Sequence, residues 1–308
     1  MFRLDVHGGS TWAEEVRYDF SDNSNPIGPP PGLEEALVQA AARGVHRRFP
    51  AHLAEEVLRE YEGVEVTLFN GATEALLYAL LDLRPRRLLV AWPSYGDYER
   101  IARLLGVPAV RVPPPLLERE ARPGDVAILC NPNNPTGFYM PRDAVLDLAG
   151  RLRRRGAFLL VDESFMEFAG GKSAAPDLPV VKSYGKFLAT PGLRIGALLY
   201  KHRDPPPWRI NSIADYAIYH TGAEFLRAHR EKTVAYVREE GARVQAAISR
   251  CVKTLPTSVH FQVVFGPPPP GVKVRPLWDK GIAGFRYSLR RPPENDVLIE
   301  AVCGVSRR

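Results

Sequence analysis

The 308-residue sequence contains 45% hydrophobic and 25% charged residues, which is typical of a globular protein and excludes a disordered or fibrous chain. The formal net charge is +6, but the arginines stand beside acidic residues in helical stretches without interleaved aromatic residues, so nucleic-acid binding is not indicated. The first residues resemble no signal segment, and no run approaches the roughly 18 apolar residues of a membrane helix. We therefore expect a soluble, cytoplasmic protein with no membrane or nucleic-acid partner.

The three cysteines, Cys130, Cys251 and Cys303, are scattered singly along the chain, without the spacing of a zinc site or a redox pair. We therefore expect neither a metal site nor a disulfide bond. The cysteines are predicted to be small, buried, apolar residues.

Helical periodicity alternates with short β-rich runs over the first two thirds of the chain. This alternation predicts an α/β domain with a mostly parallel sheet whose two faces are covered by helices. The helical stretches are 33–43, 51–61, 73–82, 98–105 and 141–155, and the β-rich runs begin at residues 88, 109, 126, 157, 179 and 195.

The pattern changes near residue 203, where "RDPPPW" interrupts it. A long helix is predicted from about 222 to 250, followed by strands at 259–265, 272–277 and 285–290 and a closing helix. This order predicts a smaller α+β domain that the N-terminal residues join. We expect a large domain over residues 25–202 and a small domain formed by 1–24 with 203–308.

In open α/β sheets, ligands bind at the carboxyl ends of the strands. The segment "NGATEAL" places Gly71 in a turn before a helix that starts near Ala72, and the free N–H groups of its first turn can bind an anion together with the Thr73 hydroxyl. An ordinary helix cap explains the threonine equally well.

Two further loops carry polar residues at strand ends. "NPNNPTG" at 131–137 forms a stiff loop that can aim an amide side chain into a cleft. Asp162 and Glu163 follow an apolar strand, and a buried carboxylate there costs free energy unless a cation or a hydrogen-bond donor meets it. Capping of the next helix is the alternative role for these acids.

Lys186 lies just beyond another strand end, among small and apolar residues. Partial desolvation lowers the pKa of a lysine and makes its amine a nucleophile toward carbonyl groups, which is Schiff-base chemistry. Ser183 and Arg194 stand nearby and would hold a phosphate. An exposed loop lysine is the alternative interpretation.

Five segments occur together in a familiar order: "NGATEAL", "PSYGDYE", "NPNNPTG", "VDES" and "SYGKFLATPGLRIG". With them the sequence resembles the fold-type I pyridoxal phosphate enzymes of the class I/II aminotransferase superfamily. The resemblance extends from residue 7 to about residue 302.

The resemblance implies a role for each matching residue. Lys186 would form the Schiff base with pyridoxal phosphate and later move protons, while Asp162 would pair with the pyridinium nitrogen. Asn134 would donate a hydrogen bond to the phenolic oxygen of the ring, and Tyr95 would stack on its face. The remaining matches surround the phosphate (Gly71, Ala72, Thr73, Ser183, Arg194) or clamp the substrate α-carboxylate (Arg286).

Two positions depart from the family pattern. Phe165 replaces a tyrosine that assists the phenolic oxygen, a loss of one hydrogen bond worth about 1 kcal/mol. Phe49 replaces a tyrosine that a neighbouring subunit usually offers to the phosphate. Because this fold commonly builds its site at a dimer interface, the resemblance still implies a homodimer.

The N-terminal "HGGS" and "DFSDNSNPIGPP" resemble the L-threonine-O-3-phosphate decarboxylases of cobalamin biosynthesis, with the histidinol-phosphate aminotransferases next. Both groups imply a small phosphorylated amino acid or amine as substrate. His7, Asn25 and Arg290 are the candidate substrate-binding residues, although His7 could equally pack the N-terminus. A third hypothesis is a binding protein that has lost its chemistry, which Lys186, Asp162 and Asn134 argue against.

Overall fold

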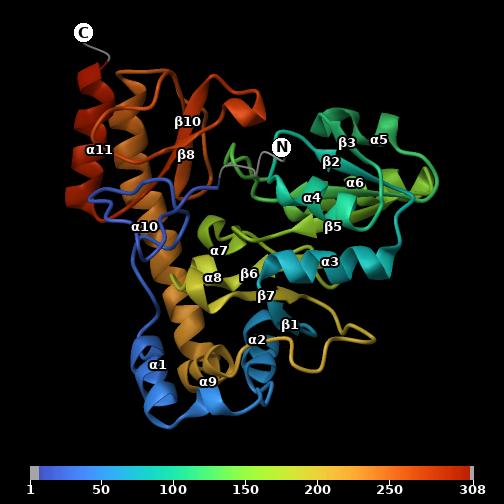
Figure 1. Ribbon diagram of the computed structural model, residues 1–308. Helices are drawn as coiled ribbons and strands as arrows, with labels where there is room; N and C mark the ends of the chain where they lie inside the picture. The colour runs from blue at the N-terminus through green and yellow to red at the C-terminus, as the bar shows by residue number, and fades with distance from the viewer. Residues whose placement is uncertain (1–6, 306–308) are drawn as a thin grey trace.

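The computed structural model describes residues 7–305, which form a large sheet between helices with a smaller sheet beside it (Figure 1). The strands of the large sheet are β1 (Thr67–Asn70), β2 (Arg87–Ala91), β3 (Ala109–Val112), β4 (Asp125–Cys130), β5 (Phe158–Asp162), β6 (Val180–Ser183) and β7 (Ile195–Leu198). Their order is β1-β7-β6-β5-β4-β2-β3, and only β7 runs antiparallel to its neighbours. The predicted mostly parallel sheet is confirmed.

The longer helices agree with the periodicity of the sequence, with one omission. The predicted helix at 222–250 is α10 (Ala223–Ser249), but α9 (Ser212–Thr221) was not predicted. Its signal is Asn211, whose side chain accepts a hydrogen bond from Ala214 N and caps the helix. The others are α1 (Leu33–Ala42), α2 (Ala54–Glu62), α3 (Ala72–Leu83), α4 (Asp97–Leu104), α5 (Leu117–Glu120), α6 (Arg142–Arg154), α7 (Met166–Ala169), α8 (Tyr184–Phe187) and α11 (Pro292–Val305). The one-turn helices α5, α7 and α8 were not predicted either.

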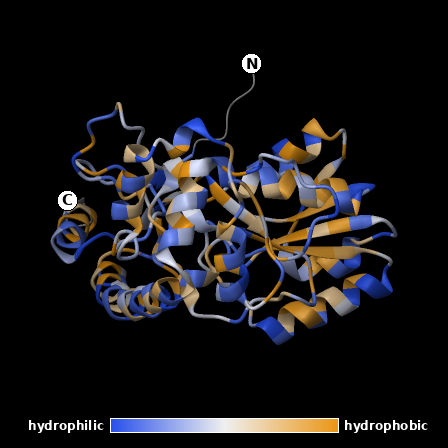
Figure 2. Cartoon of the chain, turned by 90° about the horizontal axis from the view of Figure 1, so that it is seen from below, coloured by the Kyte–Doolittle hydropathy of each residue, from blue (hydrophilic) through white to orange (hydrophobic). Residues whose placement is uncertain are grey.

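Alternate residues of each strand enter two separate hydrophobic cores, one on each face of the large sheet. In β2, Leu89 packs with residues of α2, α6 and α9, whereas Leu88 and Val90 pack with residues of α3 and α4. Figure 2 shows the largely apolar strands between helices that carry hydrophilic residues. Burial of both faces explains the near-continuous apolar runs that the sequence shows at these strands.

The smaller sheet contains β8 (Phe261–Phe265), β9 (Arg275–Pro276) and β10 (Gly284–Ser288) in the antiparallel order β8-β10-β9. The N-terminal segment packs on it, because Phe20 N donates to Lys273 O (2.7 Å) and Ser288 N donates to Phe20 O (2.8 Å). Phe20 also lies in a third hydrophobic core with residues of α10 and α11. The predicted domain boundaries, 25–202 and 1–24 with 203–308, stay a prediction.

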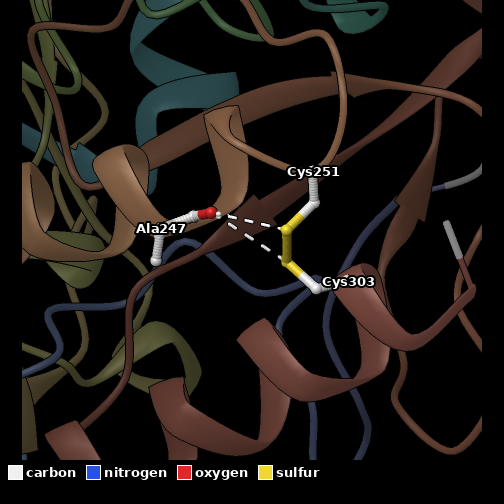
Figure 3. The surroundings of a disulfide bond; sticks show 3 residues. All are labelled: Ala247, Cys251 and Cys303. Atoms are coloured by element: carbon white, nitrogen blue, oxygen red, sulfur yellow. Dashed lines mark hydrogen bonds between the residues drawn. A yellow bond between two sulfur atoms is a disulfide. The ribbon is translucent and has the colours of Figure 1, made fainter. Parts of the chain in front are cut away.

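The expectation of no disulfide bond is wrong. Cys251 and Cys303 form one, with a Cα–Cα distance of 5.3 Å, and Figure 3 shows both sulfurs near the carbonyl oxygen of Ala247. The two cysteines are 52 residues apart in sequence, and only the packing of α11 against α10 brings them together. Cys130, in contrast, is free and buried, as expected.

Reduction of this disulfide should destabilise the protein. Opening a closed loop of 52 residues is expected to lower the free energy of unfolding by about 4 kcal/mol. Denaturant unfolding with and without dithiothreitol measures the effect, and a Cys251→Ser/Cys303→Ser variant, which has no bond to reduce, is the control. Equal midpoints for the wild type under both conditions would contradict the assignment.

Within residues 7–305, no helix is both long and apolar enough to cross a membrane. The cytoplasmic location stays a prediction. The disulfide bears on it, because such bonds are uncommon in the reducing cytosol of mesophiles.

Candidate active site

A cavity of about 250 Å³ lies at the carboxyl ends of β2, β4 and β6, where the large sheet meets the N-terminal segment and the smaller sheet. Its walls bring together residues that are up to 279 positions apart in sequence, from His7 to Arg286. The lining residues used below are His7, Ser21, Asp22, Tyr95, Asn134, Ser183, Lys186, Arg194, Arg275 and Arg286.

Asp162 is the last residue of β5 and is only 3% exposed. Its carboxylate accepts hydrogen bonds from Tyr98 Oη (2.6 Å), Ser164 N (2.9 Å) and Ser164 Oγ (2.5 Å). These donors offset part of the cost of burying the acid and fix its orientation. Asp162 itself is not among the residues that line the cavity within the described part of the chain.

Lys186 lies in α8, directly after β6, and its Nζ is 3.5 Å from Ser183 Oγ and 5.3 Å from the centre of the Phe165 ring. Burial lowers the pKa of Lys186, while the charge of Asp162 opposes this shift. A lowered pKa increases the fraction of neutral amine, which is the form that attacks a carbonyl group.

Arg194 and the start of α3 form a cradle that is closed to larger side chains. A Cβ on Gly71, whose φ is +90°, would lie 2.5 Å from Arg194 Nη2, and a Cβ on Gly196 would lie 2.2 Å from Ala72 N. The guanidinium therefore sits against the first turn of α3, whose N–H groups have no partner within the helix. Within residues 7–305, Gly71, Ala72 and Thr73 do not line the cavity themselves, but Gly71 lies against the lining residue Arg194.

Asp97, which was not among the residues predicted from the sequence, connects several of those that were. Its carboxylate accepts from Arg100 Nε (2.9 Å), Tyr95 Oη (3.0 Å) and Thr73 Oγ1 (3.3 Å), and His7 Nε2 lies 3.9 Å away. Burial raises the pKa of Asp97, but the hydrogen bonds from Arg100 and Tyr95 outweigh this and lower it. Asp97 stood in "PSYGDYE", where an acid at a helix start has an ordinary explanation.

Arg286 is 5% exposed and is held from two sides. Its Nη1 donates to Asn134 Oδ1 (2.5 Å) and its Nη2 to Ser21 O (2.6 Å), while Nε is buried without a hydrogen-bond partner. Because Asn134 accepts through its oxygen, its amide nitrogen is left as a donor for a ligand. Burial, and then the charge of Arg275, lowers the pKa of Arg286 to about 9.

Of the three candidate substrate residues, only His7 reaches the cavity. Asn25 Nδ2 donates to Phe187 O (2.9 Å), and Arg290 donates to Asp19 O (2.7 Å) and Asp22 O (3.0 Å). Both side chains thus hold backbone segments in place. Neither residue lines the cavity within residues 7–305, and their predicted contact with substrate stays a prediction.

Both phenylalanines that depart from the family pattern have aromatic surroundings. Phe165 is 2% exposed and packs edge-on against Phe261, with ring centres 4.9 Å apart. Phe49 is 70% exposed and stacks on Trp208 at 4.3 Å, so its ring lies on the surface of this chain.

Pyridoxal phosphate requires an amine for its aldehyde, an acid for its ring nitrogen and a site for its phosphate. Lys186 would supply the amine and Asp162 the acid, and the cradle at Arg194 would bind the phosphate. The residues present therefore fit this cofactor, and the fold and site together define a pyridoxal phosphate enzyme.

The comparisons with known proteins agree with this class. The family model described as aminotransferase class I and II matches residues 14–234. The threonine-phosphate decarboxylase of Salmonella typhimurium is 30% identical over 75% of this chain and 71% of its own length. The chain belongs to the class I and II aminotransferase family, whose enzymes use pyridoxal phosphate.

Other relatives are histidinol-phosphate aminotransferases, the second group that the sequence resembles. A histidinol-phosphate aminotransferase of Desulfitobacterium hafniense is 28% identical over 91% of this chain and 89% of its own length. Among solved structures, the L-threonine-O-3-phosphate decarboxylase of Porphyromonas gingivalis superposes with a TM-score of 0.79 at 22% identity, covering 94% of this chain and 99% of that one. At that identity the superposition shows the fold alone.

Proposed function

We propose that this protein decarboxylates L-threonine O-3-phosphate to aminopropanol phosphate, a step of cobalamin biosynthesis. The observation that carries the proposal is the pair Arg275 and Arg286, which both line the cavity, are each 5% exposed and lie directly opposite each other in β9 and β10. Asp279 already pairs with Arg275 (2.8 and 2.9 Å), whereas Arg286 is held by the neutral oxygens of Asn134 and Ser21. The two like charges repel each other, so an anionic ligand would stabilise Arg286 in particular. Threonine phosphate brings two anionic groups, whereas histidinol phosphate brings one.

The chain's own residues would bind and orient the substrate. When bound, pyridoxal phosphate supplies a conjugated ring that accepts the electron pair of the breaking bond. Arg286, held by Asn134 and Ser21, would set the direction of the substrate carboxylate and thereby decide which bond at Cα breaks. Lys186 Nζ would then deliver a proton to Cα after CO2 leaves.

An aminotransferase that uses histidinol phosphate, or an aromatic or acidic amino acid, is the second candidate. It is supported by relatives that cover more of the chain, 91% against 75%. An inactive binding protein is disfavoured because Lys186, Asp162 and Asn134 are all present. We also propose a homodimer, with the exposed Phe49–Trp208 pair as part of its interface.

The two enzyme functions differ in their need for a second substrate. We expect purified protein to release labelled CO2 from carboxyl-labelled threonine phosphate without any keto acid, and to form aminopropanol phosphate in equal amount. The parallel reaction contains histidinol phosphate and 2-oxoglutarate. Turnover only in that second reaction would replace the proposed decarboxylase with an aminotransferase.

A further inference from the structure

Two lysines four residues apart have different surroundings: Lys186 lines the cavity, and Lys182 is buried beside acidic residues. In β6, Ser183 lines the cavity, whereas its neighbour Lys182 is 4% exposed and faces α2 and α7. The alternation of side chains along a strand requires this. The strand end that carries Ser183 and leads to Lys186 therefore has a second, buried polar cluster on its other face.

This cluster, the Lys182 network, uses every proton of the ammonium group. Lys182 Nζ donates to Glu62 Oε1 (2.8 Å), Glu62 Oε2 (2.9 Å) and Glu167 Oε1 (2.6 Å). Tyr184 Oη donates to Glu62 Oε1 (2.6 Å). Since Tyr184 is the first residue of α8, the network holds the helix that carries Lys186 as well as the strand before it.

The electrostatics of the two lysines are opposite. Burial lowers the pKa of both, but for Lys182 the charges of Glu167 and Glu62 outweigh burial and raise its pKa. The charged form of Lys182 is therefore favoured, whereas burial favours the neutral amine of Lys186. The charged Lys182 at the end of β6 and the reactive amine of Lys186 in α8 are thus kept apart, although they are only four residues apart in sequence.

Further acids and bases surround this cation. Glu167 also meets Arg230 Nε (2.8 Å) and accepts from Tyr61 Oη (2.8 Å). Glu163, which follows Asp162, accepts from Ala174 N (2.7 Å) through one oxygen and is 1% exposed. Its backbone N–H donates to Val181 O (2.8 Å), so β5 and β6 are fastened together at the same level.

We propose that Lys182 is a positioning residue, and that its network with Glu62, Glu167 and Tyr184 sets the placement of Lys186 relative to Asp162. The inference rests on Lys186 being the cofactor lysine of the proposed function. It does not depend on which substrate is used. Without the network, β6 and α8 lose their common anchor and the amine moves relative to the acid.

The test compares three variants of the holoenzyme. It measures their affinity for pyridoxal phosphate and the pKa at which the visible absorbance band of the bound cofactor changes. Lys182→Met alone leaves two carboxylates without their cation and is expected to lower the melting temperature strongly. Lys182→Met/Glu62→Gln removes one charge of each sign and should recover much of that stability. Lys182→Arg keeps a cation and its donors.

If Lys182 positions the site, the double variant binds pyridoxal phosphate at least about 10-fold more weakly than the wild type even though its stability is recovered. The pKa of its visible absorbance band is also shifted, whereas Lys182→Arg stays close to wild type in both quantities. The matched control is Arg209→Met/Glu55→Gln, another largely buried ion pair (2.6 Å) whose residues do not line the cavity. It should leave both readouts unchanged.

Wild-type cofactor affinity and band pKa in the stable double variant would overturn the proposal, since Lys182 would then serve folding only. Equal losses in Lys182→Arg and the double variant would also overturn it. These readouts do not involve substrate, so a wild-type protein that fails to decarboxylate threonine phosphate defeats the proposed function and leaves this test intact.

Discussion

Lys186→Ala is expected to abolish the visible absorbance band of protein-bound pyridoxal phosphate and to reduce CO2 release by about 10³-fold or more. The amine is the group that would join the cofactor covalently and move the proton at Cα, and alanine offers neither function. Burial lowers the pKa of this lysine, which increases the fraction of the reactive, neutral amine. Spectra and turnover numbers of the dialysed variant measure both effects.

Lys201→Ala is the control, because it removes an exposed lysine beyond the end of β7 and should change neither quantity. A Lys186→Ala protein that keeps the band after dialysis would contradict the assignment. So would one that loses the band but retains wild-type turnover.

Asp162→Asn is expected to lower kcat by about 10²- to 10⁴-fold. Asparagine has the same size; its oxygen can still accept from Ser164, and its amide nitrogen can donate to Tyr98 Oη where Oδ2 accepted before, so the fold should be retained. The amide cannot hold a proton on the ring nitrogen, and the ring then accepts electrons poorly. Single-turnover kinetics with saturating cofactor measure the chemical step directly.

Asp147→Asn makes the same chemical change at an exposed ion pair with Arg151 on α6 and should keep wild-type kinetics. Similar melting temperatures for both variants would show that any loss in Asp162→Asn is not a folding defect. Unchanged kcat in Asp162→Asn would remove this acid from the site.

The parts of the fold that follow from local pattern were predicted well. The runs that became β2, β4 and β5 are apolar because both faces of each strand are buried, and this signal is local. Lys186 and Asn134 stand at strand ends, and the parallel sheet brings such ends to one edge. The family resemblance then supplied their roles.

The features that the sequence does not reveal are contacts between distant segments. Cys251 and Cys303 meet only because α10 and α11 pack together, and their spacing carries no sign of it. Arg290 and Asn25 are polar residues near the right segments, but their donors are consumed by backbone carbonyl groups. A sequence shows which residues can bind an anion and cannot show which of them are already engaged.

Arg275 and Asp97 were missed for the related reason that each has an ordinary local explanation. Arg275 stands in a short strand, and only its pairing with Arg286 across β9 and β10 brings it to the cavity. Asp97 begins a helix, and only the fold places Tyr95 and Thr73 around its carboxylate. In both cases the residue type alone gives no signal, because the residues that surround each side chain in the fold bring it to the site.

The most direct measurement of the central claim is borohydride reduction of the holoenzyme, followed by peptide mass spectrometry. Reduction converts the bond between cofactor and lysine into a stable amine, and fragmentation distinguishes Lys186 from Lys182 in the same peptide. The account predicts a pyridoxyl group on Lys186. A modification on Lys182 or another lysine, or none at all, would contradict it.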